Sequence, residues 1–208
     1  EILGVTSNGR ISDYLFELEL SGFIRRDYTW NLSSAEDSKI STYRLSDNYL
    51  RFYLKYIEKN LNKINRDTYD LKSLGSLPEW NSIMGLQFEN LVLNNRKLIH
   101  KAANIKTEDI VAENPFYQHK TKRIRGCQID YMIQTKFNTL YICEIKFSKQ
   151  VINYSVIQEV QQKIEELHSP KSFSYRPVLI HANGVSEDVV DSDYFTSIID
   201  ISRFFNSY

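Results

Sequence analysis

The chain has 208 residues, 42% of them apolar, which is enough for one large domain or two small ones. Lysine plus arginine and aspartate plus glutamate both number 26, so no overall field draws the protein to nucleic acid or a membrane, and such binding must come from local patches. No apolar run approaches the length of a membrane span, no signal peptide is recognisable, and two cysteines fit buried free thiols, so we expect a cytoplasmic protein. Because the first residue is not methionine, we expect a fragment of a longer chain.

The N-terminal third predicts a helix followed by a two-stranded ribbon. Residues 7–23 have apolar side chains at helical spacing and end at Gly22, and strand-like segments follow at 23–26 and 40–45. This layout is that of the last part of a winged helix-turn-helix. A small helix–hairpin unit that only packs against its neighbours is the alternative. The helix carries more acidic than basic side chains, which disfavours a phosphate-reading helix and leaves partner docking open.

Two long helices and a polar connection come next. Residues 46–63 show a helical stripe that Ser46 or Asp47 can cap, and residues 79–100 show another. The polar stretch between them predicts a boundary between a first domain, residues 1–75, and a second, residues 76–208.

Residues 110–118 read as a strand, and a compact basic run, HKTKRIR, follows it. Such a run is usually a solvated hairpin tip, whereas in a nuclease it would contact phosphates. The cations that would do so are Lys120, Lys122, Arg123 and Arg125.

The most informative stretch is QIDYMIQTKFNTLYICEIKFSK, residues 128–149, which predicts two strands joined by a short turn. If the hairpin folds about Phe137 with a three-residue loop, Asp130 lies opposite Glu144, and Lys146 projects from the same side. Two acids and a lysine on one sheet face bring repulsion or buried charge, at a cost in free energy, unless the acids bind a ligand. A divalent cation is the obvious ligand.

A helix over residues 153–168, a buried strand over 176–181 and a short last strand over 196–201 complete the pattern. From residue 79 the order is helix, three strands in a meander, crossover helix and strand. This order predicts an α/β (α+β) domain around a mixed sheet.

Residues 79–201 resemble the PD-(D/E)XK nuclease superfamily, a restriction-endonuclease-like fold with this α-β-β-β-α-β order. Its motif, an acid on the second strand followed by Glu-X-Lys on the third, is matched by Asp130 and Glu144-Ile145-Lys146. Glu89 stands in place of the acid on the first helix, although such a residue is more often a solvated flank of an apolar stripe. One departure is Ile129, which stands where many members have proline.

The chain is more similar still to a group of prokaryotic AAA-type ATPases, in which a P-loop domain precedes a winged helix and a nuclease-like C-terminal domain. The segments YRLSDNYLRFYLKYI, MGLQFENLV and QIDYMI…LYICEIKFSK carry this resemblance in the right order. The chain contains no G-x-x-x-x-G-K loop, so the resemblance implies that an ATPase domain lies upstream of Glu1 in the same polypeptide.

The nuclease resemblance implies a role for each motif residue. Asp130, Glu144 and the carbonyl of Ile145 offer hard oxygen ligands that suit Mg²⁺ or Mn²⁺. Such an ion would activate a water and neutralise charge on the scissile phosphate. Lys146 would position that water or stabilise the developing oxyanion.

Two further side-chain roles follow from the same resemblance. Glu89 would orient a metal water or hold a second ion, and Gln158 or Gln161 would fix the phosphodiester or hydrogen-bond the lysine. No Ser/His/Asp or Cys/His nucleophile set is discernible in the sequence.

Two functions of different class therefore remain open. The first is a metal-dependent nuclease domain acting on DNA and appended to an ATPase, which the complete set of Asp130, Glu144 and Lys146 favours. The second is a catalytically silent nuclease-like fold that serves regulation, DNA binding or protein interaction within that ATPase. The neutral overall charge and the acidic first helix favour the second. A winged helix acting like a transcription factor is a weaker third possibility.

Overall fold

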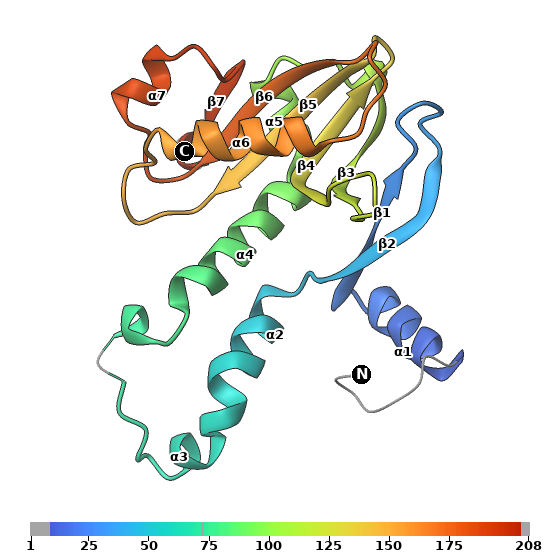
Figure 1. The fold of residues 1–208 in the computed structure, drawn as a ribbon. Helices are drawn as coiled ribbons and strands as arrows, with labels where there is room; N and C mark the ends of the chain where they lie inside the picture. The colour runs from blue at the N-terminus through green and yellow to red at the C-terminus, as the bar shows by residue number, and fades with distance from the viewer. Residues whose placement is uncertain (1–8, 72, 205–208) are drawn as a thin grey trace. The chain divides into compact units, whose positions relative to one another are not determined.

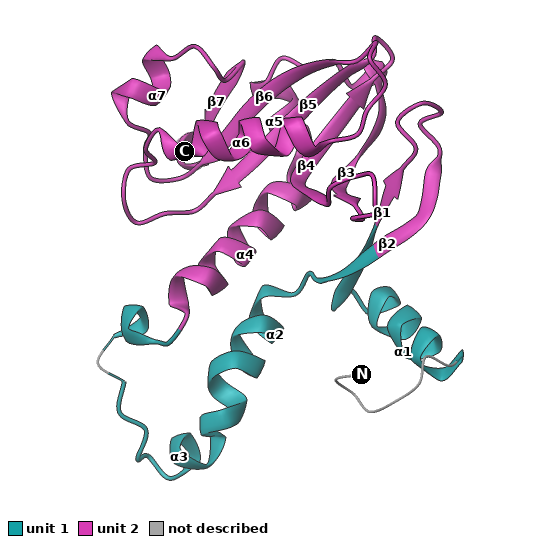
Figure 2. Cartoon of the chain, in the orientation of Figure 1, with its two compact units in different colours: residues 1–27, 42–78 teal, residues 28–41, 79–208 magenta. Residues whose placement is uncertain are grey.

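The structure is a computed structural model that describes residues 9–71 and 73–204. The chain divides into two compact units, residues 1–27 with 42–78, and residues 28–41 with 79–208 (Figure 2). The first unit ends at Pro78 and the second resumes at Glu79, and the segment 28–41 groups with the second unit. Within the described ranges, no helix is both long enough and apolar enough for a bilayer crossing.

The first unit begins with α1 (Gly9–Leu20), which buries none of its side chains. Gly22 ends this helix as the sequence predicts, since its φ of +78° lies in the left-handed region that glycine adopts without strain. The Phe23 amide donates to the carbonyl of Leu18 at 3.0 Å, which closes the helix end. A two-stranded antiparallel ribbon follows, made of β1 (Ile24–Trp30) and β2 (Asp37–Leu45).

The helix predicted over residues 46–63 is helical along its length but not α-helical throughout. Asp47 caps its start, because its carboxylate accepts the amide of Leu50 at 2.5 Å. The segment comprises α2 (Asn48–Phe52), a π-helical turn (Tyr53–Ile57), a 3₁₀ turn (Glu58–Asn60) and α3 (Leu61–Asn65). Tyr56 is the buried residue of the π-helical turn, and its hydroxyl donates to the carbonyl of Pro78 at 2.7 Å.

The second unit is built on a five-stranded mixed sheet in the order β3-β4-β5-β6-β7 (Figure 1). The first three strands are antiparallel neighbours, and the last three run parallel. The predicted α-β-β-β-α-β order and mixed α+β class are therefore confirmed. The strands are β3 (Ile110–Gln118), β4 (Cys127–Thr135), β5 (Thr139–Lys146), β6 (Ser174–His181) and β7 (Ser197–Asp200). The helices are α4 (Trp80–Asn94), α5 (Arg96–Ala102), α6 (Ser155–Glu166) and α7 (Glu187–Asp191), with 3₁₀ turns at Thr107–Asp109 and Ile201–Phe204. A further 3₁₀ turn, Leu74–Ser76, belongs to the first unit.

The helix predicted over residues 79–100 is broken at Asn95 into α4 and α5. Asn95 leaves the helical region, with φ −120° and ψ 34°, and its side-chain amide donates to the carbonyl of Leu91 at 2.7 Å. An asparagine side chain competes for backbone groups in this way, and such competition ends helices.

Each face of the sheet covers its own apolar cluster. Cys143 and Ile145 of β5 pack with residues of α4 and α5, whereas Leu140 and Ile142 pack with α6, which crosses the other face (Figure 1). Glu144 lies between Cys143 and Ile145 in a strand, so it projects toward α6. Both cysteines are buried free thiols, as predicted.

The tip of the β1–β2 ribbon is part of the core of the second unit. The Trp30 indole nitrogen donates to Gln134 Oε1 at 2.6 Å, and the indole ring packs edge-on against Phe116 with centroids 5.1 Å apart. The Gln134 amide in turn donates to the carbonyl of Leu32 at 3.0 Å. These contacts explain why residues 28–41 do not belong with the rest of the N-terminal segment, a pairing that no local sequence pattern encodes.

Candidate functional site

The β4–β5 hairpin has the register that the alternation of its side chains predicts. Its observed pairs run from Thr135 opposite Thr139 to Tyr131 opposite Cys143, which leaves a three-residue loop, 136–138. One further step along the same register brings Asp130 and Glu144 opposite each other.

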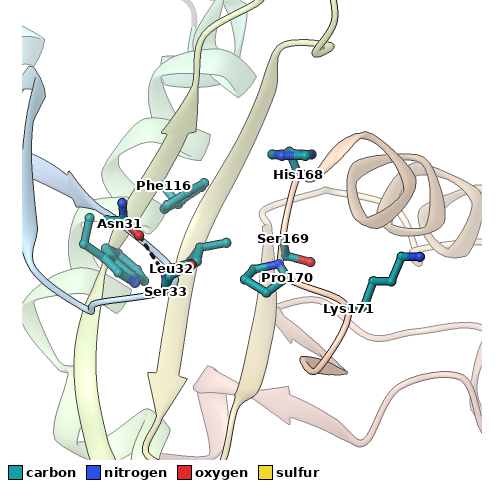
Figure 3. A pocket seen from close by; sticks show the side chains of 9 residues that line it. Asn31, Leu32, Ser33, Phe116, His168, Ser169, Pro170 and Lys171 are labelled. Atoms are coloured by element: carbon teal, nitrogen blue, oxygen red, sulfur yellow. Dashed lines mark hydrogen bonds between the residues drawn. The ribbon is translucent and has the colours of Figure 1, made fainter.

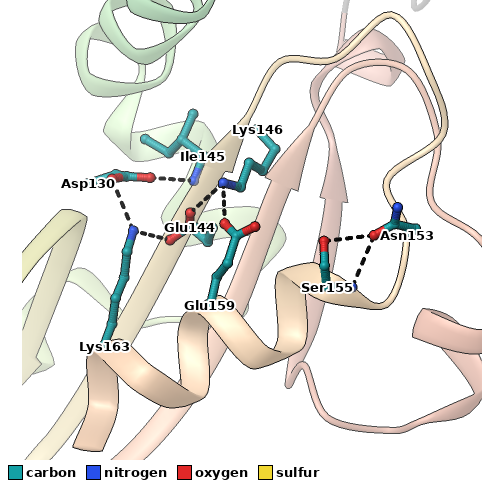
Figure 4. Close-up of polar contacts among 8 residues, drawn as sticks. All are labelled: Asp130, Glu144, Ile145, Lys146, Asn153, Ser155, Glu159 and Lys163. Atoms are coloured by element: carbon teal, nitrogen blue, oxygen red, sulfur yellow. Dashed lines mark hydrogen bonds and ion pairs between the residues drawn. The ribbon is translucent and has the colours of Figure 1, made fainter. Parts of the chain in front are cut away.

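The two carboxylates converge on one cation, the ammonium of Lys163 on α6 (Figure 4). Lys163 Nζ lies 2.5 Å from Glu144 Oε2 and 3.4 Å from Asp130 Oδ1. The side chain of Glu144 is 3% exposed and that of Asp130 is 14% exposed. The acid pair is therefore nearly withdrawn from water and lies on the α6 side of the sheet.

Lys146 joins this group from the end of β5. Its Nζ lies 3.1 Å from Glu144 Oε1 and 2.6 Å from Glu159 Oε2 on α6 (Figure 4). Burial by itself would lower the pKa of Lys146, but the hydrogen bond to Glu159 and the charge of Glu144 outweigh it and raise that pKa. Lys146 is therefore a protonated donor at neutral pH rather than a base.

Burial and the neighbouring charges shift the pKa values of Glu144 and Lys163. Burial and the neighbouring charge of Asp130 raise the pKa of Glu144, against the opposing effect of Lys163 and Lys146. Burial also acts to lower the pKa of Lys163, but Asp130 and Glu144 outweigh it and raise that pKa. Lys163 and Lys146 thus partly offset the effect of burial on Glu144.

Ile145 contacts the site through its amide. The Ile145 N–H donates to Asp130 Oδ2 at 3.0 Å, which turns the other oxygen of Asp130 toward Lys163. The predicted role of Ile145 used its carbonyl as a metal ligand, and that role stays a prediction.

The roles predicted for Glu89 and Gln158 stay predictions. Glu89 is a partly exposed residue of α4, a helix that packs through Phe88 and Val92 on the cluster containing Cys143 and Ile145. Within residues 9–71 and 73–204, no group of three or more His, Cys, Asp or Glu side chains is arranged to hold a metal ion, so Glu89 does not complete such a group. Gln158 is exposed on α6.

The α6 residues that reach the site are Glu159 and Lys163, and sequence analysis did not identify them. Lys163 follows the buried Val160 by three residues and Val156 by seven, so it lies on the apolar stripe of the helix. A charged residue on such a stripe is the signal that would have found it. Glu159 is four residues before Lys163, on the same face.

The basic run forms the exposed loop between β3 and β4. Lys120, Lys122, Arg123 and Arg125 are all exposed, and Arg125 Nη1 lies 3.7 Å from Glu166 Oε1 at the end of α6. The loop leads directly into β4, whose fourth residue is Asp130. Its cations thus belong to the same end of the sheet as the acid pair.

The donor set of this group fits a small hard cation in part. Asp130 and Glu144 each direct an oxygen at a single cationic position, and Mg²⁺ is commonly bound through one or two carboxylates with water completing its shell. A third carboxylate, histidine or cysteine ligand is absent from the described residues. Oxygen ligands alone suit Mg²⁺ or Mn²⁺ better than zinc, so Asp130 and Glu144 are the residues that would hold such an ion.

A separate pocket of about 550 Å³ lies between the ribbon tip and the loop after α6 (Figure 3). None of the predicted site residues is among its described lining. Trp30 and Phe116, its two aromatic residues, are largely buried in the core and offer no open ring face. The lining comprises Trp30, Asn31, Leu32, Ser33, Phe116, His168, Ser169, Pro170 and Lys171.

Comparison with protein-family models and with curated proteins finds no match for this chain. Among solved structures, a crystal structure of a repair endonuclease from Pyrococcus abyssi matches with a TM-score of 0.35 and 13% sequence identity. The match covers 54% of this chain and 44% of the endonuclease, so it spans less than half of that protein. A likeness at this level defines no family for the chain, and its function is inferred from the site.

Proposed function

We propose that residues 79–201 form a Mg²⁺- or Mn²⁺-dependent phosphodiesterase domain of the endonuclease kind, acting on DNA. The observation that carries this proposal is the convergence of Asp130 and Glu144 on one cationic position, with the Lys146 ammonium 3.1 Å from Glu144. Phosphodiester cleavage asks little covalent chemistry of protein groups, so a cation site and a positioned lysine are the essential parts.

Each residue of the group has a definite task in this proposal. Asp130 and Glu144 hold the cation, and the Ile145 amide keeps Asp130 turned toward it. A divalent cation supplies there the neutralisation of phosphate charge that the reaction needs. Lys146, kept protonated by Glu159 and Glu144, stabilises the negative charge that develops on the phosphate oxygens.

The wider setting is part of the same proposal. The domain acts in the cytoplasm as the C-terminal part of a P-loop ATPase, behind a winged-helix segment formed by residues 1–75. The exposed cations Lys120, Lys122, Arg123 and Arg125 contact the phosphates of DNA at the end of the sheet that carries Asp130.

Nicking of supercoiled plasmid by the purified chain in Mn²⁺ tests the proposal. We expect Asp130→Asn, which removes one ligand charge, and Lys146→Met, which removes the donor, each to lower the nicking rate by about 10²–10³-fold. Asp191→Asn is the matched control, because Asp191 is exposed at the end of α7 and loses the same charge.

Equal nicking by the wild type, Asp130→Asn and Lys146→Met would assign the activity to a contaminant and contradict the proposal. Absence of nicking across Mg²⁺, Mn²⁺, single-stranded DNA and duplex DNA would favour a second candidate function. That candidate is a catalytically silent nuclease-like fold that serves as a regulatory, DNA-binding or protein-interaction module of the ATPase. The pairing of both acids with lysines is the observation that favours it.

A further inference from the structure

Lys163 occupies the place between the two acids that a divalent cation would take. Its Nζ contacts one oxygen of each carboxylate, Glu144 Oε2 at 2.5 Å and Asp130 Oδ1 at 3.4 Å. These are the oxygens that the proposed function assigns to the cation. An ammonium and a divalent cation repel each other and cannot share one position between two carboxylates.

The surroundings hold the backbone of Lys163 in place but leave its side chain room to move. The preceding turn of α6 is anchored by the fully buried Val160, and the Lys163 carbonyl accepts the Cys127 thiol at 3.3 Å. The side chain of Lys163 is 24% exposed, so it is not sealed within the core. Lys146 differs, because Glu159 holds its ammonium from outside the acid pair.

We infer that Lys163 is a resident counter-ion of the site, which a divalent cation must displace from Asp130 and Glu144 in order to bind. The inference rests on the proposed function, in that it takes these two acids as the cation ligands. Displacement makes the strength of the Lys163 contacts a direct determinant of cation affinity. The site is thereby kept neutralised and folded until a cation replaces the lysine.

Calorimetric titration of the full chain with Mn²⁺ tests this inference. Lys163→Met keeps the length of the side chain and removes its charge, so we expect the Kd for Mn²⁺ to fall by about tenfold. Lys171→Met is the matched control, because Lys171 is exposed eight residues further along, and its loss is expected to leave the Kd unchanged within about twofold. Without metal, Lys163→Met is expected to melt at a lower temperature than the wild type, and Mn²⁺ is expected to raise its Tm more.

The outcomes separate this inference from the function on which it rests. Wild-type binding with an equal or weaker affinity in Lys163→Met overturns the displacement of Lys163 and leaves the metal site standing. Binding by neither protein overturns both. Binding by Lys163→Met alone supports displacement and shows that the lysine silences the wild-type site.

A measurement on the wild type keeps the inference testable if Lys163→Met fails to fold. An amine-acetylating reagent is applied with and without Mn²⁺, and modification of each lysine is followed by peptide mass spectrometry. The acetylation rate of Lys163 is expected to rise several-fold at a Mn²⁺ concentration that saturates the calorimetric signal, while that of Lys171 stays constant. An unchanged rate for Lys163 under those conditions overturns the inference.

Discussion

At the residue scale, a second buried polar group lies on the opposite face of the sheet from the acid pair. His100 Nε2 lies 2.7 Å from Glu113 Oε2 and 2.8 Å from the Tyr131 hydroxyl, which itself donates to that Glu113 oxygen. Burial acts to raise the pKa of Glu113, but the hydrogen bonds of His100 and Tyr131 and the charges of His100 and Arg96 outweigh it and lower that pKa. The ionised carboxylate of Glu113 therefore stabilises the fold.

Replacing Glu113 by glutamine is expected to lower the free energy of unfolding by about 1–3 kcal/mol at pH 7, because it weakens the contacts to two buried partners. The folded-state pKa lies below the ordinary value of 4.5, so this stabilisation is present above pH 4.5 and is lost as the pH falls through the folded-state pKa. The difference between wild type and Glu113→Gln should thus shrink below pH 4.5. Urea unfolding over a pH series measures it.

The control for this prediction is Glu108→Gln, since Glu108 is exposed in the turn before β3. Its effect should be small at every pH. A difference between wild type and Glu113→Gln that stays constant from pH 7 to pH 3 would show that the ionised carboxylate contributes nothing.

At the element scale, the loop between β3 and β4 concentrates positive charge on a chain whose overall charge is zero. The four cations of the loop are exposed, and its backbone is closed by the Thr121 amide, which donates to the Ile124 carbonyl at 2.9 Å. Electrostatic binding of DNA by this chain must therefore come from such a local patch.

The double variant Lys122→Ala/Arg123→Ala is expected to weaken DNA binding and to reduce the slope of log K against log salt by about 2, or about 0.9 for each DNA phosphate that the protein no longer neutralises. Its Mn²⁺ affinity should stay at the wild-type value, because neither side chain contacts Asp130 or Glu144. Fluorescence anisotropy at several salt concentrations measures the slope. Lys97→Ala/Lys101→Ala, on the exposed side of α5, is the charge-matched control, and an equal effect there would contradict a role for the loop.

At the scale of the whole molecule, the two compact units are interleaved along the chain. Trp30 lies between the two segments of the first unit in sequence but contributes to the core of the second, where it is 4% exposed. Tyr56, also 4% exposed, is the corresponding buried aromatic residue of the first unit. A substitution in the core of one unit should therefore destabilise the segments of that unit, including those distant in sequence, and not the neighbouring segments of the other unit.

Trp30→Ala is expected to lower the stability of the second unit by about 3–5 kcal/mol, because it leaves a cavity beside Phe116 and removes the indole donor to Gln134 Oε1. Hydrogen exchange followed by mass spectrometry should show faster exchange in β3 and β4. Tyr56→Ala should instead raise exchange in residues 48–65 and leave β4 and β5 unchanged. The opposite assignment of the two effects would refute the interleaved units.

The local patterns of this sequence were sufficient to predict the strands and the half of the site that the β4–β5 hairpin carries. The alternation in residues 128–149 and the short loop predict the register that places Asp130 beside Glu144, since side-chain period and loop length fix a hairpin. Helix ends at Gly22 and Asp47 followed from side-chain chemistry in the same way. Each of these features depends on residues close together along the chain.

The contributions of Lys163, Glu159 and the ribbon tip were decided only by the tertiary structure. Whether α6 directs Lys163 at the acid pair depends on how the helix crosses the sheet, and Trp30 reaches Gln134 across a separation of 104 residues. Glu89 shows the same limit, because helical spacing says which residues share a face but not which part of the sheet that face meets. The sequence by itself thus determined the strand register and the acid pair, whereas packing between distant segments determined which cation neutralises them.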